Sequence, residues 1–305
     1  MVGAGGELRL DDVYRQFLEA QYRPSTVAVY WRATASFVHW MRMHGMPVTI
    51  EGVTRYLSTV PAGARPLHAY AIKSYLGFMG FEQVARQVPV PRGSYIRIRP
   101  QMWFPYPLIK YMVEHTSSAR LAAMIAVAYD LALRREELRR LNRVQLENEP
   151  YVDVGTGRAI VYRMKTRQYP WQQLQLSRWA ITYLRRYLDS RADGGPALFA
   201  GPDGQRLSPS AIDAFIRGRL RDEFGVPGVS MKAFRHSRLT WMAVEGHSLI
   251  DIAKWAGHST PNPTLVYIHA AERFRMNPLA SIEFLKGTPI YPTAVRLLED
   301  YASHA

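Results

Sequence analysis

The sequence predicts a mostly α-helical protein with a small three-stranded β-sheet, arranged in two domains. Its 305 residues are more than one compact domain usually holds. Apolar residues recur at helical spacing along most of the chain, whereas three short segments near the middle alternate apolar and polar residues as strands do. A proline-rich stretch without periodicity separates the two parts. We therefore expect one domain over residues 1–90, a linker over 91–106 and a second domain over 107–305.

The first domain is predicted to be a compact bundle of four or five helices joined by short loops. Each helix is indicated by apolar residues at helical spacing and by hydroxyl, Pro or Gly residues at its ends. The four clearest helices are expected at about 10–18, 25–41, 49–57 and 65–80. This bundle covers residues 8–88.

The linker combines prolines with basic side chains. Residues 88–107 contain five prolines and show no periodicity, which is typical of an extended segment. Arg92, Arg97 and Arg99 lie in the same stretch. An extended basic linker is suited to the DNA backbone, so these arginines are candidate DNA contacts. A linker that is simply solvated would have the same composition.

The second domain is expected to be helical with one β insertion. Its strands are predicted at 151–154, 159–164 and 172–176, with turns at 156–157 and 165–170. A strongly apolar helix over 121–133 precedes the sheet. Further helices are expected at about 178–190, 208–224, 232–245 and 248–256, and in the C-terminal tail at 293–303.

The composition favours a polyanionic partner. The chain has 39 Lys and Arg residues against 25 Asp and Glu, a formal net charge of +14, and only six of the basic residues are Lys. The fork of donors on Arg matches phosphate oxygens bidentately, whereas Lys offers a point charge. A genome bias would explain Arg in place of Lys but not the surplus over acidic residues. We therefore expect double-stranded DNA as the partner.

The chain contains no Cys, which excludes disulfides, zinc–thiolate sites and cysteine nucleophiles. No signal peptide and no apolar run of about 20 residues is evident. We expect a soluble cytoplasmic protein, associated with the nucleoid and without a membrane partner. His236, His247 and His269 lack the spacing of a metal set, so we expect no metal and no cofactor.

Several short motifs occur in an order suited to phosphoryl transfer on DNA. They are Arg134 within Leu133–Leu138, Lys165 in the second turn of the sheet, Lys232 three residues before Arg235, and His258 nine residues before Tyr267. A tyrosine hydroxyl is a candidate nucleophile, and two arginines can neutralise the phosphate. Arg135 competes with Arg134, but the spacing to Glu137 favours Arg134. We expect the histidine turn to feed a short helix that ends near the tyrosine.

In this order the motifs resemble those of the tyrosine recombinase (phage integrase) family. The resemblance covers about residues 105–270 in detail, and 8–88 more loosely as the helical core-binding domain of that family. The second domain would then be the α+β tyrosine recombinase catalytic domain. Two positions depart from the family pattern: Ala132 lies where many members carry Gly, and Lys232 where most carry His.

The resemblance also implies a role for each residue. Tyr267 attacks the scissile phosphate to give a 3′-phosphotyrosine and a free 5′-hydroxyl. Arg134 and Arg235 neutralise the charge that builds on the phosphate oxygens. Lys165 protonates the leaving 5′-oxygen, and His258 donates a hydrogen bond to the phosphate or takes up the proton of the nucleophile.

Other residues are expected around this set. Lys232 contacts the phosphate or supports the hairpin lysine, and which of the two is the general acid stays open. Glu137 is expected to pair with Lys232 or with the arginines, and His269 to orient the surroundings of the tyrosine or to cap its helix. Arg163 and Arg167, beside the hairpin lysine, are candidate DNA contacts.

Three functions are compatible with these residues. The first is a site-specific recombinase, of integrase or transposase type, that acts as a homotetramer on DNA carrying specific recombination sites. The second is a DNA-relaxing enzyme like the type IB topoisomerases, and the third is a non-enzymatic DNA-binding regulator. The tail from Ala280 either docks into a neighbouring subunit or packs on its own domain.

Overall fold

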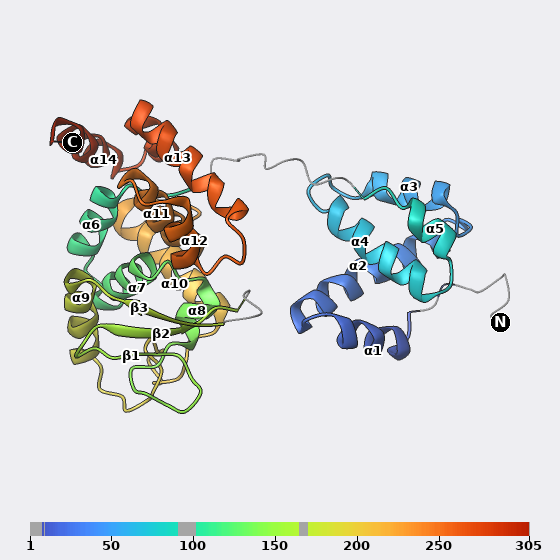
Figure 1. Ribbon diagram of the computed structural model, residues 1–305, viewed down its shortest axis with the longest axis horizontal. Coiled ribbons are helices and arrows are strands. Elements are labelled where there is room, and N and C mark those ends of the chain that lie inside the picture. The colour runs from blue at the N-terminus through green and yellow to red at the C-terminus, as the bar shows by residue number, and fades with distance from the viewer. Residues whose placement is uncertain (1–7, 9, 91–101, 165–169, 305) are drawn as a thin grey trace. The chain divides into compact units, whose positions relative to one another are not determined.

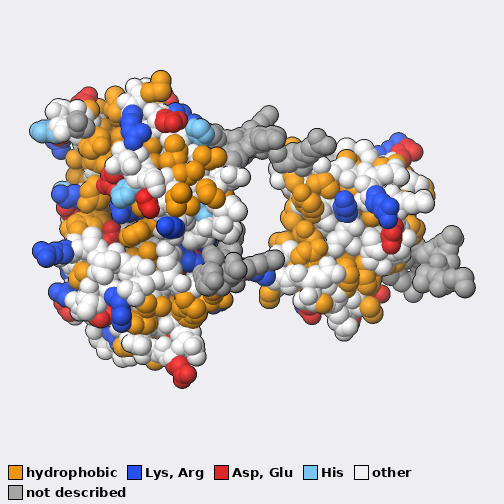
Figure 2. All heavy atoms as spheres, viewed as in Figure 1, with side chains coloured by type: hydrophobic (Ala, Val, Ile, Leu, Met, Phe, Trp, Pro, Cys, Tyr) orange, Lys and Arg blue, Asp and Glu red, His pale blue; other side chains and the backbone are white. Residues whose placement is uncertain are grey.

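The computed structural model describes residues 8, 10–90, 102–164 and 170–304. The chain divides into two compact units, Met1–Arg97 and Ile98–Ala305 (Figure 1). Helices make up most of both units, and a three-stranded antiparallel sheet lies in the second. The predicted fold class is therefore confirmed. Lys and Arg side chains are spread over the visible face of each unit (Figure 2).

The first unit is a bundle of five helices. They are α1 (Asp12–Gln21), α2 (Pro24–Met43), α3 (Ile50–Thr59), α4 (Arg65–Phe78) and α5 (Glu82–Gln87). The Asp11 carboxylate accepts from the backbone N–H of Tyr14 at the start of α1, and the Thr49 hydroxyl caps α3 in the same way. Aromatic side chains fill the centre, where the Tyr14 and Tyr75 rings meet edge to face at 4.9 Å.

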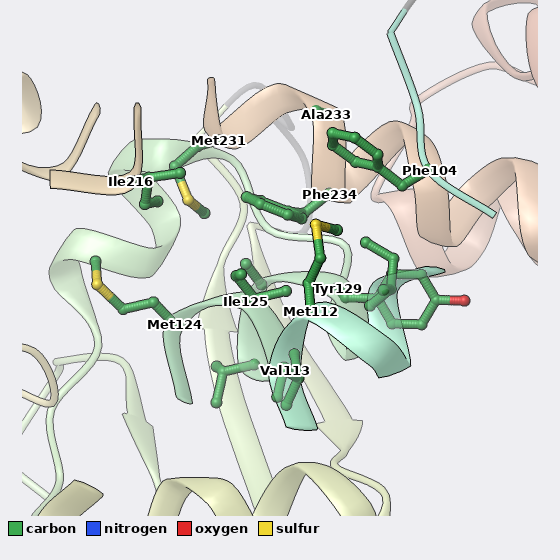
Figure 3. Packing of buried hydrophobic residues seen from close by; sticks show 14 of the residues in the cluster. Phe104, Met112, Val113, Met124, Ile125, Tyr129, Ile216, Met231, Ala233 and Phe234 are labelled. Carbon is green, nitrogen blue, oxygen red and sulfur yellow. The ribbon is translucent and has the colours of Figure 1, made fainter. Parts of the chain in front are cut away.

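The second unit is built around one apolar helix. Its elements are α6 (Tyr106–His115), α7 (Ala119–Asp130), α8 (Arg135–Arg140), α9 (Arg178–Asp189), α10 (Pro209–Phe224), α11 (Met231–Val244), α12 (Leu249–Ala256), η1 (Asn262–Thr264), α13 (Leu265–Met276), η2 (Pro278–Leu285) and α14 (Tyr291–His304). In α7 every side chain from Leu121 to Asp130 is buried. Its small alanines let α6, α9 and α11 pack closely against it, with Phe104 and Phe234 closing one side (Figure 3).

The sheet runs in the order β1 (Tyr151–Val152), β2 (Arg158–Tyr162) and β3 (Trp171–Gln175), with neighbours antiparallel. Ile160 pairs with Tyr151 on one side and with Gln173 on the other. Gly157, at φ +75°, makes the first turn, as the sequence predicts. The second turn, which contains Lys165, lies in residues 165–169, outside the described residues.

The linker predicted over 91–106 extends too far towards the C-terminus, because its last residues belong to the second unit. Trp103 and Phe104 are core residues of the second unit, and the N–H of Phe104 donates to the Ser237 hydroxyl at 2.7 Å. Pro105 and Pro107, which suggested a linker, lie at the start of α6, where a missing N–H costs nothing. Residues 91–101, with the candidate DNA contacts Arg92, Arg97 and Arg99, lie outside the described residues.

The C-terminal tail is part of the core of the second unit. Ile282, Leu285 and Leu298 are fully buried in it. The ring of Tyr301 lies 5.1 Å from that of Trp241 on α11. Of the two expected arrangements, the structure therefore has the tail packed on its own unit.

Among the described helices, none combines the length and the apolar character that crossing a bilayer requires. Over the same residues, no three His, Cys, Asp or Glu side chains are grouped as a metal site would need.

Candidate active site

The candidate nucleophile, Tyr267, lies in the first turn of α13 and is 6% exposed. Helix α12 ends at Gly257, which takes the left-handed conformation at φ +63°. The chain then passes through His258 and η1 before α13 begins at Leu265. The expectation of a helix that ends near the tyrosine was wrong, because Tyr267 lies near the beginning of the helix. This start directs the tyrosine back towards the turn that carries His258.

Arg235 lies on the buried face of α11 and is 4% exposed. Its guanidinium donates to the carbonyl oxygens of Ala132 and Ala256, the latter at 2.7 Å, and to Nε2 of His258 at 3.3 Å. Burial, together with the charge of Arg134, lowers the pKa of Arg235 to about 10. The group therefore stays charged at neutral pH and is fixed by carbonyls from two separate turns.

The carbonyl of Ala132 points at Arg235 because of an unusual backbone conformation. Ala132 has φ +48°, in the left-handed region that costs a side-chain-bearing residue about 1 kcal/mol. This is the position at which glycine was noted as the more common residue. The turn forms with Ala at this position, since the N–H of Ala132 donates to the carbonyl of Tyr129 at 3.0 Å.

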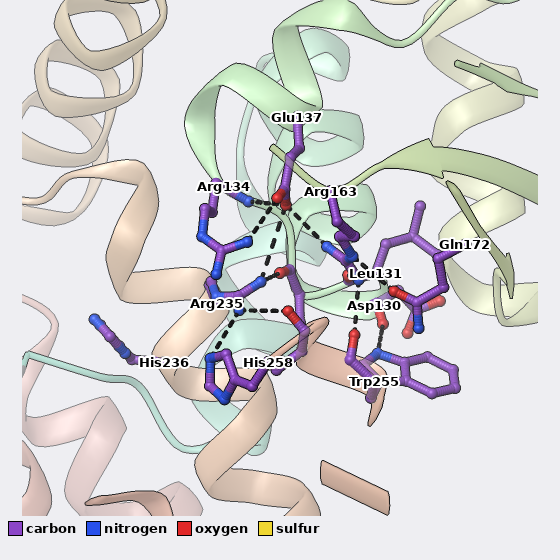
Figure 4. A network of polar contacts seen from close by, with 12 residues as sticks. Asp130, Leu131, Arg134, Glu137, Arg163, Gln172, Arg235, His236, Trp255 and His258 are labelled. Atoms are coloured by element: carbon purple, nitrogen blue, oxygen red, sulfur yellow. Dashed lines mark hydrogen bonds and ion pairs between the residues drawn. The ribbon is translucent and has the colours of Figure 1, made fainter. Parts of the chain in front are cut away.

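Glu137 lies at the centre of three arginines and is fully buried (Figure 4). Its carboxylate accepts from Arg134 Nη1 at 2.7 Å and from Arg163 Nη1 at 2.8 Å, and lies 3.9 Å from Arg235 Nη1. Burial alone would raise the pKa of this carboxyl, but the three positive charges hold it below its usual value. Glu137 thus pairs with the arginines, while Lys232 is exposed in the first turn of α11.

Arg163 is not available to DNA, which corrects its assignment as a candidate contact. It is 1% exposed, and besides its ion pair it donates to the Gln172 amide at 2.7 Å, the Leu131 carbonyl at 3.1 Å and the Trp255 carbonyl at 2.7 Å. Strand alternation is the signal that was missed, because a residue two after the buried Val161 lies on the same inward face. Arg163 therefore ties the end of β2 to α12 and to the carboxylate.

His258 is fixed between the tyrosine and the arginines. Its Nδ1 lies 2.8 Å from the Thr264 hydroxyl, and its ring is nearly parallel to that of Tyr267 at 6.4 Å between centroids. Burial and the charges of Arg235 and Arg134 lower the pKa of His258 to about 4. The ring is therefore neutral at neutral pH. Because Arg235 can only donate to Nε2, the ring proton lies on Nδ1 and is donated to Thr264.

The sequence reasoning missed His236, which contacts the tyrosine directly. Its Nδ1 lies 3.1 Å from the hydroxyl oxygen of Tyr267. The sequence signal that could have identified His236 is its position directly after Arg235, on the same predicted helix. His269, expected near the tyrosine, instead bonds Glu272 at 3.2 Å on the exposed side of α13. Two residues along a helix turn a side chain through about 200°, so His269 faces away.

A comparison with models of known protein families identifies most of the second unit. Residues 107–273 match the model of the phage integrase family. The chain belongs to this family. The match runs from the start of α6 to α13 and contains each of the residues described above.

Family members with similar sequences include two tyrosine recombinases named XerC. That of Rickettsia prowazekii is 27% identical over 150 residues, covering 48% of this chain and 46% of that protein. That of Herpetosiphon aurantiacus is 26% identical over 181 residues, covering 53% and 55%. The chain thus spans about half the length of the relatives it matches.

Solved structures of family members share the fold at low identity. The XerH recombinase in its post-cleavage complex with difH DNA has a TM-score of 0.61 at 15% identity, over 84% of this chain and 79% of that chain. A λ integrase dimer on a core site has a TM-score of 0.62 at 13% identity, over 84% and 75%. The Tn1549 transposon integrase with transposon-end DNA also has a TM-score of 0.62 at 13% identity, over 88% and 98%.

A cavity of about 500 Å³ lies beside the tyrosine of this family member. Tyr267 and His236 line it together with Trp103, Phe274 and Phe284. Burial raises the pKa of the Tyr267 hydroxyl, and the neighbouring guanidinium groups of Arg235 and Arg134 oppose this rise. The arrangement offers a buried candidate nucleophile, whose hydroxyl would need a proton acceptor in order to react.

Two predicted site residues, Lys165 and Arg167, lie outside the described residues. The described ends of the flanking strands lie against the last turn of α12, where Arg163 donates to the carbonyl of Trp255 and Gln172 to that of Lys254. The structure therefore brings together Arg134, Glu137, Arg235, His258 and Tyr267.

Proposed function

We propose that this protein is a site-specific DNA recombinase that cleaves and rejoins DNA strands through Tyr267. The Tyr267 oxygen forms a bond to the scissile phosphorus, the bond from phosphorus to the 5′-oxygen breaks, and a 3′-phosphotyrosine with a free 5′-hydroxyl results. The covalent link retains the energy for rejoining, so the reaction needs no cofactor. The observation that carries the proposal is the buried Tyr267 beside the guanidinium of Arg235.

The two arginines stabilise the transition state in different ways. The Arg134 side chain is 23% exposed and uses Nη1 on Glu137, which leaves part of its donor fork facing the site. Arg235 is buried and held by two carbonyls, so it supplies a positioned charge. Extra negative charge on the phosphate oxygens is stabilised by such donors, and losing one costs on the order of 3 kcal/mol.

The 5′-oxygen leaves with a proton from a lysine. Lys165 is the first candidate, because the strands on either side of its turn are anchored next to His258. Lys232 is the second, since it is exposed in the first turn of α11, three residues before Arg235. A substrate with sulfur in place of the leaving 5′-oxygen needs no protonation, so it restores cleavage only to the variant that lacks the general acid.

Double-stranded DNA carrying a recombination site is the proposed partner. The net charge of +14 supports a polyanion, and the XerH, λ integrase and Tn1549 structures are complexes with DNA. The helical unit over 1–90 would bind DNA together with the linker arginines Arg92, Arg97 and Arg99, and with Arg167. We also propose a homotetramer on paired sites, in the cytoplasm and associated with the nucleoid. Contacts of that assembly would lie outside the tail segments packed in the core.

The test uses DNA that the protein itself selects. Duplexes that the protein binds are selected from a random-sequence library, and a nick is then placed close to the cleavage site. After cleavage the short fragment that carries the free 5′-hydroxyl dissociates, so rejoining is impossible and the covalent adduct is trapped. Wild-type protein should form an adduct linked to the DNA 3′-end at Tyr267, and Tyr267→Phe should form none. An adduct in the Phe variant would overturn the assignment. Relaxation of a plasmid without selected sites, at the rate seen with them, would favour a topoisomerase.

A further inference from the structure

His236 is in direct contact with the hydroxyl of Tyr267. Its Nδ1 lies 3.1 Å from the Tyr267 oxygen, and the two rings are 5.7 Å apart between centroids. Both residues are held by helices, His236 by α11 and Tyr267 by the first turn of α13. These helices pack against each other, so the contact is built into the fold.

Within the described part of the chain, the acceptor found at hydrogen-bond distance from the Tyr267 hydroxyl is Nδ1 of His236. Arg235, whose charge acts on the tyrosine hydroxyl, has only donors. The two ring nitrogens of His258 are already used by Arg235 and Thr264. In Figure 4 His236 makes no bond to the arginine cluster, so its Nδ1 remains for the tyrosine.

We infer that His236 is the general base that takes the proton of Tyr267 during strand cleavage, an inference that rests on the proposed function. As the tyrosine oxygen bonds to phosphorus, its proton moves to Nδ1 of His236, and the 5′-oxygen leaves with a proton from the lysine acid. In rejoining, the 5′-oxygen attacks phosphorus and gives its proton back to the lysine amine. The bond from phosphorus to the tyrosine oxygen breaks, and the imidazolium of His236 returns its proton to that oxygen.

The surroundings of His236 suit this role. Burial is the main cause that lowers the pKa of His236 to about 4, and the charges of Arg235 and Lys232 add to it. The ring is therefore neutral at neutral pH and able to accept a proton. His236 also lines the cavity of about 500 Å³ beside the tyrosine. The cavity therefore gives water a place beside the imidazole, to which the proton can pass.

The experiment compares full-length variants on the nicked substrate described above. His236→Ala removes the base, whereas His236→Gln keeps a hydrogen-bond acceptor but cannot take up a proton. Both should form the covalent adduct about 100-fold more slowly than wild type or worse. The matched control is His269→Ala, two residues from the tyrosine but bonded to Glu272, which should react at the wild-type rate.

A more acidic nucleophile separates proton transfer from packing. With fluorotyrosine at position 267, the loss caused by His236→Gln should shrink, because a phenol that ionises more readily needs less help from a base. A wild-type rate in His236→Gln, or a loss that fluorotyrosine leaves unchanged, overturns the inference while the recombinase assignment stands. A wild-type protein that forms no adduct on its selected DNA overturns the proposed function itself.

Discussion

Arg163 and Glu137 form a fully buried ion pair, with Nη1 and Oε2 2.8 Å apart, that joins the end of the β-sheet to the arginine cluster. The same guanidinium bonds the last turn of α12, so the sheet, the first arginine motif and the histidine turn meet at one side chain. Movement of any one of these elements would therefore disturb the other two.

Removing this arginine should be strongly destabilising. Arg163→Met leaves Glu137 with one partner fewer in a buried position, and breaking such a pair typically costs about 3–5 kcal/mol. Urea unfolding at neutral pH measures the loss. Arg158, an exposed residue of the same strand, gives the matched control Arg158→Met, which should change stability by less than about 1 kcal/mol. Equal losses in the two variants would contradict a central role for Arg163.

Adding a methyl group at Gly257 should disturb the same arginine. Gly257 has φ +63°, and a Cβ there would lie 2.9 Å from Cγ of Arg163. Gly246 ends α11 at φ +86° with nothing within 4 Å of its Cβ position, so Gly246→Ala carries backbone strain without a clash. We expect about 1 kcal/mol for Gly246→Ala and a clearly larger loss of unfolding free energy for Gly257→Ala. Equal losses of unfolding free energy in the two variants would show that the Arg163 side chain can move aside without cost.

Acid should weaken the fold through two half-buried histidines, His236 and His258. The pKa values of His236 and His258 are lowered to about 4 in the folded protein, against 6.5 for an ordinary histidine. Between these values the unfolded chain binds more protons than the folded one, so stability falls as pH drops from about 6.5 to about 4. Replacing either histidine by Gln should flatten this part of the stability curve.

The control for the pH experiment is His269→Gln, since this histidine is exposed and pairs with Glu272 on the surface of α13. Chemical unfolding at several pH values between 4 and 7 gives the slopes. If His269→Gln flattens the curve as much as His258→Gln does, burial is not the origin of the pH dependence.

The tail should contribute to the stability of the second unit. Leu298 is 1% exposed in its core, so Leu298→Ala should cost about 2–5 kcal/mol, whereas the exposed neighbour Glu299 should tolerate Ala. The comparison is made by thermal or urea unfolding of the two variants. A tail that functions only in a neighbouring subunit would give no difference between them in dilute protein.

Much of the architecture follows from local patterns. Helices α9, α10, α11, α12 and α14 and the three strands lie within a few residues of their predicted positions, because their caps and periodicities are local. The predicted linker instead extended to the first residue of α6, since Pro105 and Pro107 break helices except in the first turn. The end of that predicted linker belongs to the core because Phe104 packs against Phe234, which lies far along the chain.

The sequence by itself determined the family and the order Arg134, Arg235, His258 and Tyr267, because these residues occur at characteristic spacings. The tertiary structure alone decided that Arg163 faces inward, that His236 rather than His269 contacts the tyrosine, and that the tail packs on its own unit. The physical reason is that each of these contacts joins elements distant in sequence. They meet through turns such as those at Ala132 and Gly257, whose left-handed backbone directs carbonyls and side chains to one point.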